Sequence, residues 1–128
     1  MASKPSTKDI ERFSAAFKQR SIESFNKRAR GVVEFKFSKH FFDRVEQRAS
    51  WDDLGVLNQM VQNAIKYHLC EMLYWAHLPN RSHRLEIRRG KYVVGCIYSD
   101  TFNRIICTTF VNNRKYDGEQ NPFVITVR

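Results

Sequence analysis

Three side chains that could act on a phosphodiester are spaced four residues apart in the first half of the chain. They are His40, Arg44 and Arg48. If residues 39–49 form a helix, which turns about 100° per residue, the three lie one above another on its exposed side. The opposite arc of that helix is apolar and must face the core, and it consists of Phe41, Phe42, Val45 and Ala49.

Such a column suits RNA cleavage. RNA carries its own nucleophile, the ribose 2′-hydroxyl, so a ribonuclease needs a base, an acid for the departing 5′-oxygen and positive charge for the transition state. His40 can act as the base or the acid near neutral pH, and the planar fork of Arg44 can bind the extra phosphate charge. The same spacing also occurs on helix faces whose charges are only solvated, so the pattern leaves both interpretations open.

The other histidines and the cysteines indicate neither a metal site nor a disulfide framework. His68 continues the apolar stripe of a third helix, which indicates either a core histidine or a second functional group. His77 and His83 flank a loop and fit no zinc-ligand spacing. The three cysteines form no Cys-x-x-Cys pair, and no acidic cluster suited to two metals is visible. We expect no metal, no cofactor and a reduced, cytoplasmic protein.

The charge balance favours a phosphate polymer as partner. Lys and Arg number 22 against 13 Asp and Glu, which gives a net charge of +9. A small basic protein often meets nucleic acid, although the charge could serve solubility alone. The cluster Lys27, Arg28 and Arg30 fits either the C-terminus of a helix or contact with RNA. No run of eighteen apolar residues exists, so no membrane span is expected.

Periodicity predicts helices followed by strands. Thr7 can cap a first helix that ends near Gly31, and Ser50 with Asp53 resembles a capping box for the third helix. Segment 70–76 is either a strand or an extension of that helix. Strands are predicted at 32–37, 84–89, 92–99, 104–111 and 123–128. We expect one α+β domain over residues 1–128 with residues 1–8 disordered, in which N-terminal helices cover one face of a small antiparallel sheet and the other face is open.

Two segments resemble the RegB-type sequence-specific endoribonucleases of bacteriophages. Segment 35–48, FKFSKHFFDRVEQR, is similar to the strand-to-helix segment of that family, and segment 81–95, RSHRLEIRRGKYVVG, to its Arg-x-x-Arg-Leu-Glu-Ile hairpin. By position, His40 matches a catalytic histidine of the family, and Arg44 lies in the same motif. The family's second catalytic histidine has no counterpart, because the corresponding turn holds residues 60–63. His68 could substitute, the role could be filled differently, or catalysis could be lost.

The resemblance implies a RelE-like fold and metal-free cleavage of single-stranded RNA that leaves a cyclic phosphate and a 5′-hydroxyl. It implies GGAG-like targets in the ribosome-binding sites of early phage messages, and stimulation by a host ribosomal protein or the ribosome. We expect a monomer in the host bacterial cytoplasm, with His40, Arg44 and His68 in catalysis. The RNA backbone would be held by Arg48, Arg81, Arg84 and Arg88, with Tyr92 and Tyr98 available to stack on bases. The alternatives are a non-catalytic RNA-binding or host-takeover protein, and a RelE-type toxin that cuts ribosome-bound messages.

Overall fold

The computed structural model of the chain describes residues 4–113 and 121–128. In this part of the chain there are four helices and five strands. Their order is α1 (Thr7–Ala29), β1 (Glu34–Phe37), α2 (Lys39–Arg48), α3 (Trp51–Tyr67), α4 (Leu69–Ala76), β2 (Leu85–Arg89), β3 (Tyr92–Ser99), β4 (Arg104–Val111) and β5 (Phe123–Thr126). The structure thus confirms an α+β fold whose helices lie in the N-terminal part of the chain.

The five strands form one sheet in the order β1-β4-β3-β2-β5. The meander β2-β3-β4 is antiparallel, as the short turns between these strands predict. The sheet as a whole is mixed rather than antiparallel, because β1 runs parallel to β4 and β5 runs parallel to β2. Long connections bring these two outer strands to the sheet, and a long connection permits either direction.

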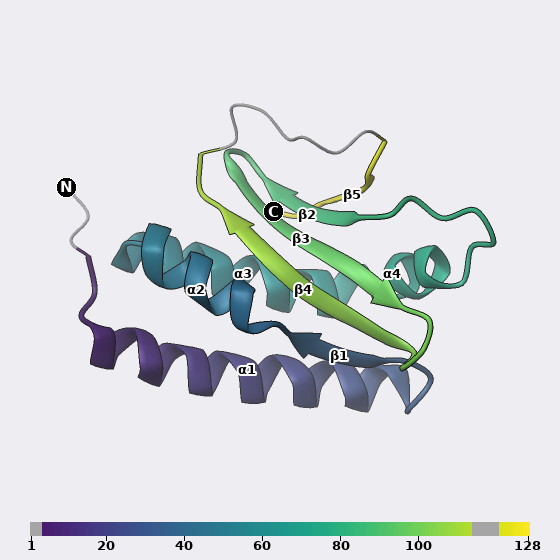
Figure 1. Cartoon of the computed structure of the whole chain (residues 1–128), viewed down its shortest axis with the longest axis horizontal. Helices are drawn as coiled ribbons and strands as arrows, with labels where there is room; N and C mark the ends of the chain where they lie inside the picture. Colours follow the sequence, from purple (N-terminus) through teal and green to yellow (C-terminus); the bar gives the residue numbers. More distant parts are fainter. Residues whose placement is uncertain (1–3, 114–120) are drawn as a thin grey trace.

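The helices pack on one face of the sheet and share a single hydrophobic core with it. Figure 1 shows α1 along the lower side of the molecule, beneath β1, with α2 and α3 above it. Phenylalanine rings join these layers: Phe25 lies 4.6 Å from Phe35 and Phe17 lies 4.9 Å from Phe37, between ring centroids. The strands contribute the alternate side chains that face the helices, which include Leu85, Ile87, Val94, Cys96, Ile105, Cys107 and Phe110.

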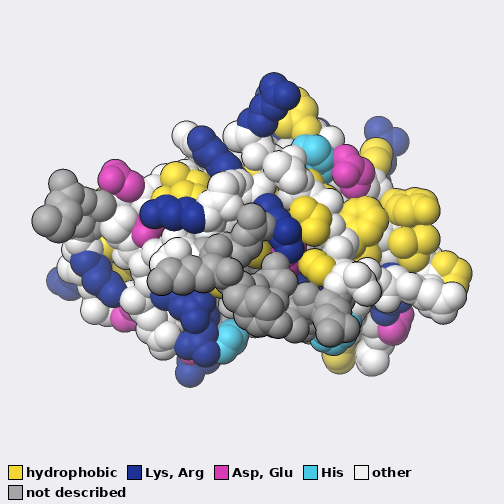
Figure 2. Space-filling model, turned by 90° about the horizontal axis from the view of Figure 1, so that it is seen from above, with side chains coloured by type: hydrophobic (Ala, Val, Ile, Leu, Met, Phe, Trp, Pro, Cys, Tyr) yellow, Lys and Arg dark blue, Asp and Glu magenta, His cyan; other side chains and the backbone are white. Residues whose placement is uncertain are grey.

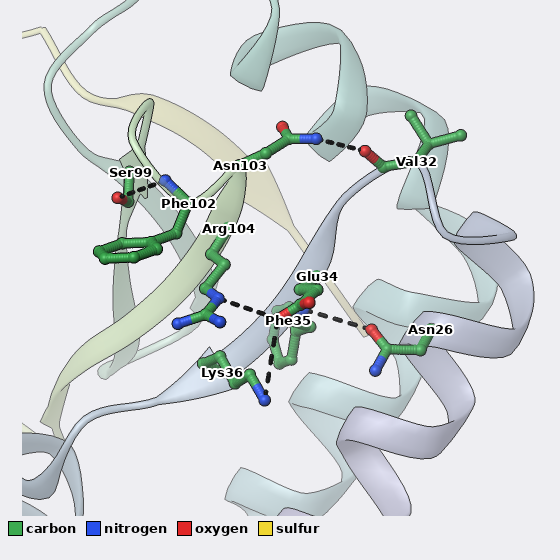
Figure 3. A network of polar contacts seen from close by, with 9 residues as sticks. All are labelled: Asn26, Val32, Glu34, Phe35, Lys36, Ser99, Phe102, Asn103 and Arg104. Atoms are coloured by element: carbon green, nitrogen blue, oxygen red, sulfur yellow. Dashed lines mark hydrogen bonds and ion pairs between the residues drawn. The ribbon is translucent and has the colours of Figure 1, made fainter.

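Polar contacts at its beginning tie β1 to its neighbours (Figure 3). The backbone N–H of Phe35 donates to Oδ1 of Asn26 from α1 at 3.4 Å. On the other side, Arg104 Nε of β4 donates to Glu34 Oε2 at 2.8 Å. These contacts fix the register in which Glu34 stands opposite Arg104 and Phe37 opposite Cys107.

The start of α1 differs from the sequence-based expectation, and the structure decides between the two alternatives for segment 70–76. Ser6 rather than Thr7 caps α1, in a capping box with Asp9, so residues 7 and 8 are helical. The predicted disorder of residues 1–8 is therefore too long at that end, and residues 1–3 lie outside the described part. Segment 70–76 is helical and belongs to α4. Its Trp75 is fully buried and donates its indole N–H to the carbonyl of Ser82 at 2.9 Å.

Gly95 in β3 provides a sharp test of the packing on the outer face of the sheet. It stands opposite Glu86 in β2 and Thr109 in β4. A Cβ at this position would lie 2.7 Å from the Arg84 guanidinium carbon and 2.7 Å from Thr109 Cγ2. We expect Gly95→Ala to lower the free energy of unfolding by about 1–3 kcal/mol in urea denaturation, because neighbouring atoms must move.

Gly55→Ala is the matched control. A Cβ at Gly55, inside α3, meets nothing within 4 Å, so the same change should stabilise the protein by up to about 1 kcal/mol. A Gly95→Ala protein as stable as the wild type would contradict the placement of Arg84 over Gly95.

Candidate nucleic-acid interface

The first turn of α2 presents His40 to solvent at the edge of the sheet. Ser38 caps the helix by accepting from the N–H of Phe41, and its own N–H donates to the carbonyl of Cys107 in β4 at 3.0 Å. Phe41 is fully buried, whereas His40 is exposed, as the helical wheel predicts. No acidic residue occupies this first turn, so the positive end of the helix dipole is not neutralised there.

Arg44 lies one turn beyond His40 on the same side of α2, with its guanidinium oriented by a neighbour. Its Nη1 donates to Gln47 Oε1 at 2.8 Å. Gln47 carries no charge, so the positive charge of Arg44 is not neutralised by this contact. His40, which is exposed, and Arg44, which is partly exposed, therefore place an imidazole and a cation on successive turns of one helix face.

Arg48, the third member of the predicted column, has a structural contact instead. Its Nη1 donates to the backbone carbonyl of Phe110 in β4 at 2.7 Å. Burial lowers the pKa of Arg48 below its ordinary value, and the nearby charge of Arg44 lowers it further. Arg48 thus attaches the end of α2 to the edge of β4, and its predicted role in holding RNA would compete with that bond.

The three other predicted RNA-binding arginines are also engaged. Arg84 and Arg88 both pair with Glu86, at 3.0 Å and 2.5 Å, on the outer face of β2. Glu86 is fully buried and was not among the predicted site residues. The signal for it was present, since Glu86 alternates between the two arginines along one face of the strand. This triad carries a net charge of +1 rather than the +2 of its arginines alone.

Arg81 lies in the loop before β2 and is held by β3 and the turn that follows it. Its Nη2 lies 2.6 Å from Asp100 Oδ2, and its guanidinium carbon lies 4.5 Å from the centre of the Tyr98 ring. Tyr98 also packs edge-on against Trp75. Neither Arg81 nor Tyr98 is therefore a free contact for RNA, although both remain partly exposed.

Tyr92 points towards the helices rather than out to the open face. Its ring stacks on Phe110, and its hydroxyl donates to Asp53 Oδ1 at 2.8 Å. Burial of the Tyr92 hydroxyl, its hydrogen bond to Asp53 and the negative charge of Asp53 raise the pKa of Tyr92 to about 12. The predicted stacking of this ring on an RNA base is not supported by its position.

The structure does not bring His68 to His40. His68 lies at the junction of α3 and α4, where its Nδ1 is 2.8 Å from Glu71 Oε1. It is partly exposed, so it is not the core histidine that the apolar stripe suggested. It lines a pocket with residues 126–128, at the end of β5, whereas α2 packs against β4. Those strands are three spacings apart, about 14 Å, which is too far for two groups acting on one phosphodiester.

Positive charge is not gathered in one patch on the upper face of the molecule. Figure 2 shows Lys and Arg side chains spread along this face, with hydrophobic side chains at its right-hand end.

Within residues 4–113 and 121–128, no three His, Cys, Asp or Glu side chains come together as possible metal ligands. None of the helices in the described part has the length and apolar character needed to cross a membrane.

Comparisons with protein-family models, with curated proteins and with solved structures found no match to this chain. The chemistry proposed below therefore depends on the geometry of the side chains and on the segment resemblance described above.

Asp53 holds the end of α2 in place and gives the site a pH dependence. Burial opposes its ionisation, but hydrogen bonds from the Ser50 backbone, Asn112 and Tyr92 outweigh it, so the pKa of Asp53 is lowered. Asn112 also donates to the carbonyl of Arg48, the last residue of α2. Asp53 thereby links β3, β4 and the α2–α3 junction.

Replacement of Asp53 by Asn should show this linkage. A lowered pKa contributes stability that is complete above the unfolded value, near 3.9, and is lost as pH falls through the folded value. We expect Asp53→Asn to be about 1–2 kcal/mol less stable than the wild type at pH 7 in urea denaturation. The difference should shrink below about pH 4. Asp52→Asn, an exposed change in the same turn, is the control. A difference that stays constant down to pH 3 would contradict this role.

Proposed function

We propose that the chain is an endoribonuclease that cleaves single-stranded mRNA without a metal, through attack of the ribose 2′-hydroxyl. The observation that carries the proposal is the pair of exposed His40 and partly exposed Arg44 on successive turns of α2. The resemblance of segments 35–48 and 81–95 to RegB-type enzymes supports the same chemistry and suggests GGAG-like targets.

The local geometry of α2 supports phosphate binding beside His40. The helix begins at Lys39, and its first turn contains no acid, so the partial positive charge of its N-terminus acts together with the side-chain cation. His40 would take the proton of the 2′-hydroxyl as general base while the 2′-oxygen bonds to phosphorus. The bond from phosphorus to the 5′-oxygen breaks, and the departing 5′-oxygen would take a proton from water. Arg44 would stabilise the negative charge that develops on the phosphate oxygens.

A second candidate is an RNA-binding protein without catalysis, such as one that alters host translation. The separation of His68 from His40 favours it, because His40 then lacks a histidine partner to protonate the leaving 5′-oxygen. The two candidates differ in one outcome, which is whether the bound RNA is cut. A RelE-type toxin would in addition require ribosomes for cleavage. In each case we propose that the protein is encoded by a phage and acts as a monomer in the bacterial cytoplasm. Its proposed partner is a host ribosomal protein or the ribosome.

Cleavage of purified RNA in EDTA tests the proposal. The wild type should cut a GGAG-containing single strand, and 2′-deoxyribose just 5′ to the scissile phosphate should prevent the cut. His40→Ala should reduce the rate by about 10²–10⁴-fold, because a general acid or base is lost. Arg44→Ala should also lose activity while keeping its fold, and Arg44→Lys should restore only part of it, because a point charge lacks the planar fork.

His68→Ala is the control for these variants. Because His68 lies beside β5, at the opposite edge of the sheet from α2, its loss should leave the cleavage rate within a few-fold of the wild type. Cleavage of the deoxy-substituted strand, or full activity of His40→Ala, would refute the mechanism. Tight binding without any cut, with or without ribosomes, would establish the non-catalytic candidate instead.

A further inference from the structure

Four cations without acidic partners gather at the ends of two helices, at positions other than the predicted arginines. Lys27, Arg28, Arg30 and Lys66 line one pocket of about 600 Å³, together with Ser24, Tyr67, Leu69 and Cys70. No carboxylate belongs to this lining. Within the described part of the chain, none of the four cations forms an ion pair, in contrast to Arg81, Arg84 and Arg88.

Three helices meet at this pocket. Figure 1 shows the end of α1 below α4, and the end of α3 supplies Lys66 and Tyr67. Leu69 and Cys70 belong to the first turn of α4, whose N-terminus has no side-chain cap. Glu71 in the same turn offsets the positive end of the α4 dipole, so the positive charge of the pocket comes from its four basic side chains. The C-terminal ends of α1 and α3 offset only part of this charge.

The backbone conformation of Arg30 suggests that its side chain has a role besides ending α1. Arg30 is the C-cap of α1 and has φ +54° and ψ +37°, in the left-handed region. A side chain with a Cβ is disfavoured there, and helices usually place glycine or asparagine at this point. The other two described non-glycine residues with positive φ are both asparagines. An arginine at such a position, with its side chain in a basic pocket, points to a ligand.

Tyr67 adds an aromatic ring to the basic pocket, which favours a nucleic acid over a simple anion. Its side chain is 65% exposed, and Lys66 Nζ lies 5.1 Å from the centre of its ring. An exposed ring beside unpaired cations is the combination on which an unpaired base stacks while its phosphates are neutralised. We infer that this pocket, formed by Lys27, Arg28, Arg30, Lys66 and Tyr67, binds the backbone and one base of a single-stranded RNA.

This site is separate from the face that carries His40. The helix α2 lies beside the first half of α1. The two helices line a second pocket, which includes Ile10 and Lys18 of α1. The ten residues from Lys18 to Arg28 rise about 15 Å along the helix axis. From the proposed function the inference takes only that the ligand is RNA, and it does not depend on cleavage.

Cys70 offers a direct reporter for occupancy of the pocket. It is exposed and lines the pocket, whereas Cys96 and Cys107 are buried. A ten-nucleotide single-stranded RNA with 2′-O-methyl groups, which cannot be cut, should slow alkylation of Cys70 by N-ethylmaleimide. Lys27→Ala/Arg28→Ala should abolish most of this protection. The matched control, Lys8→Ala/Arg12→Ala at the other end of α1, removes the same two charges and should retain it.

The salt dependence of RNA binding gives a second measurement. Each phosphate contact on a single strand contributes about −0.7 to the slope of log affinity against log salt. The pocket double variant should therefore have a slope about 1.4 shallower than the wild type and bind roughly tenfold more weakly at 0.15 M salt. Arg30→Gly should weaken binding without lowering the melting temperature by more than a few degrees, because glycine tolerates the left-handed conformation.

The outcomes separate the two proposals. RNA that is bound and cut while Cys70 stays unprotected would refute the pocket alone. Protection of Cys70 by the 2′-O-methyl strand, together with no cut in the unmodified RNA of the same sequence, would support the pocket and refute the cleavage proposal. If Lys8→Ala/Arg12→Ala changes the salt slope as much as Lys27→Ala/Arg28→Ala, the effect comes from net charge alone. That result would overturn the inference. A wild type that binds no RNA at low salt would overturn both.

Discussion

The unequal lengths of β1 and β4 are the constraint on which the position of α2 depends. β1 has four residues and pairs with the first half of the eight-residue β4, so residues 108–111 lack a strand partner on that side. Buried backbone groups need hydrogen-bond partners, and α2 supplies one through Arg48, which donates to the carbonyl of Phe110. Asn112 and Asp53 close the arrangement from the other side. Ser38, the residue directly after β1, caps the N-terminus of α2. This places His40 at the edge of the sheet.

The electrostatics of the molecule follow from which charges the fold neutralises. The chain has nine more basic than acidic residues, but the arginines nearest to the sheet bind Glu86, Asp100 or a backbone carbonyl. These contacts stabilise the hairpin and reduce its capacity to hold a phosphate backbone. In the described part of the chain, cations without a carboxylate partner include Arg44 on α2 and the group at the ends of α1 and α3. A nucleic acid would be attracted by the whole positive field, yet would make its charge-neutralising contacts where no carboxylate competes.

Sequence patterns predicted the parts of the fold that depend on local chemistry. The apolar arc of residues 41–49, the meander with its Gly90 turn and the capping box at Ser50 all follow from short-range spacing, and the structure confirms them. The parallel pairing of β1 and β5 could not be predicted, because both strands arrive through long connections. Segment 70–76 is equally apolar as a strand or a helix, and only packing of Trp75 decides between them. The position of His68 depends on where α3 ends, which hydrophobic periodicity does not specify.

The proposed RNA-binding site lies at exposed His40 and partly exposed Arg44 on α2. The most direct test is an NMR titration of ¹⁵N-labelled protein with a 2′-O-methyl GGAG-containing strand, in which backbone amide shifts report the residues that contact the ligand. RNA bound there should cause saturable shifts in residues 39–44, which weaken as salt is raised, and only small shifts at residues 124–126 of β5, the strand at the opposite edge of the sheet. Shifts that are confined to β5, or that are absent from α2 at saturating RNA, would contradict this prediction.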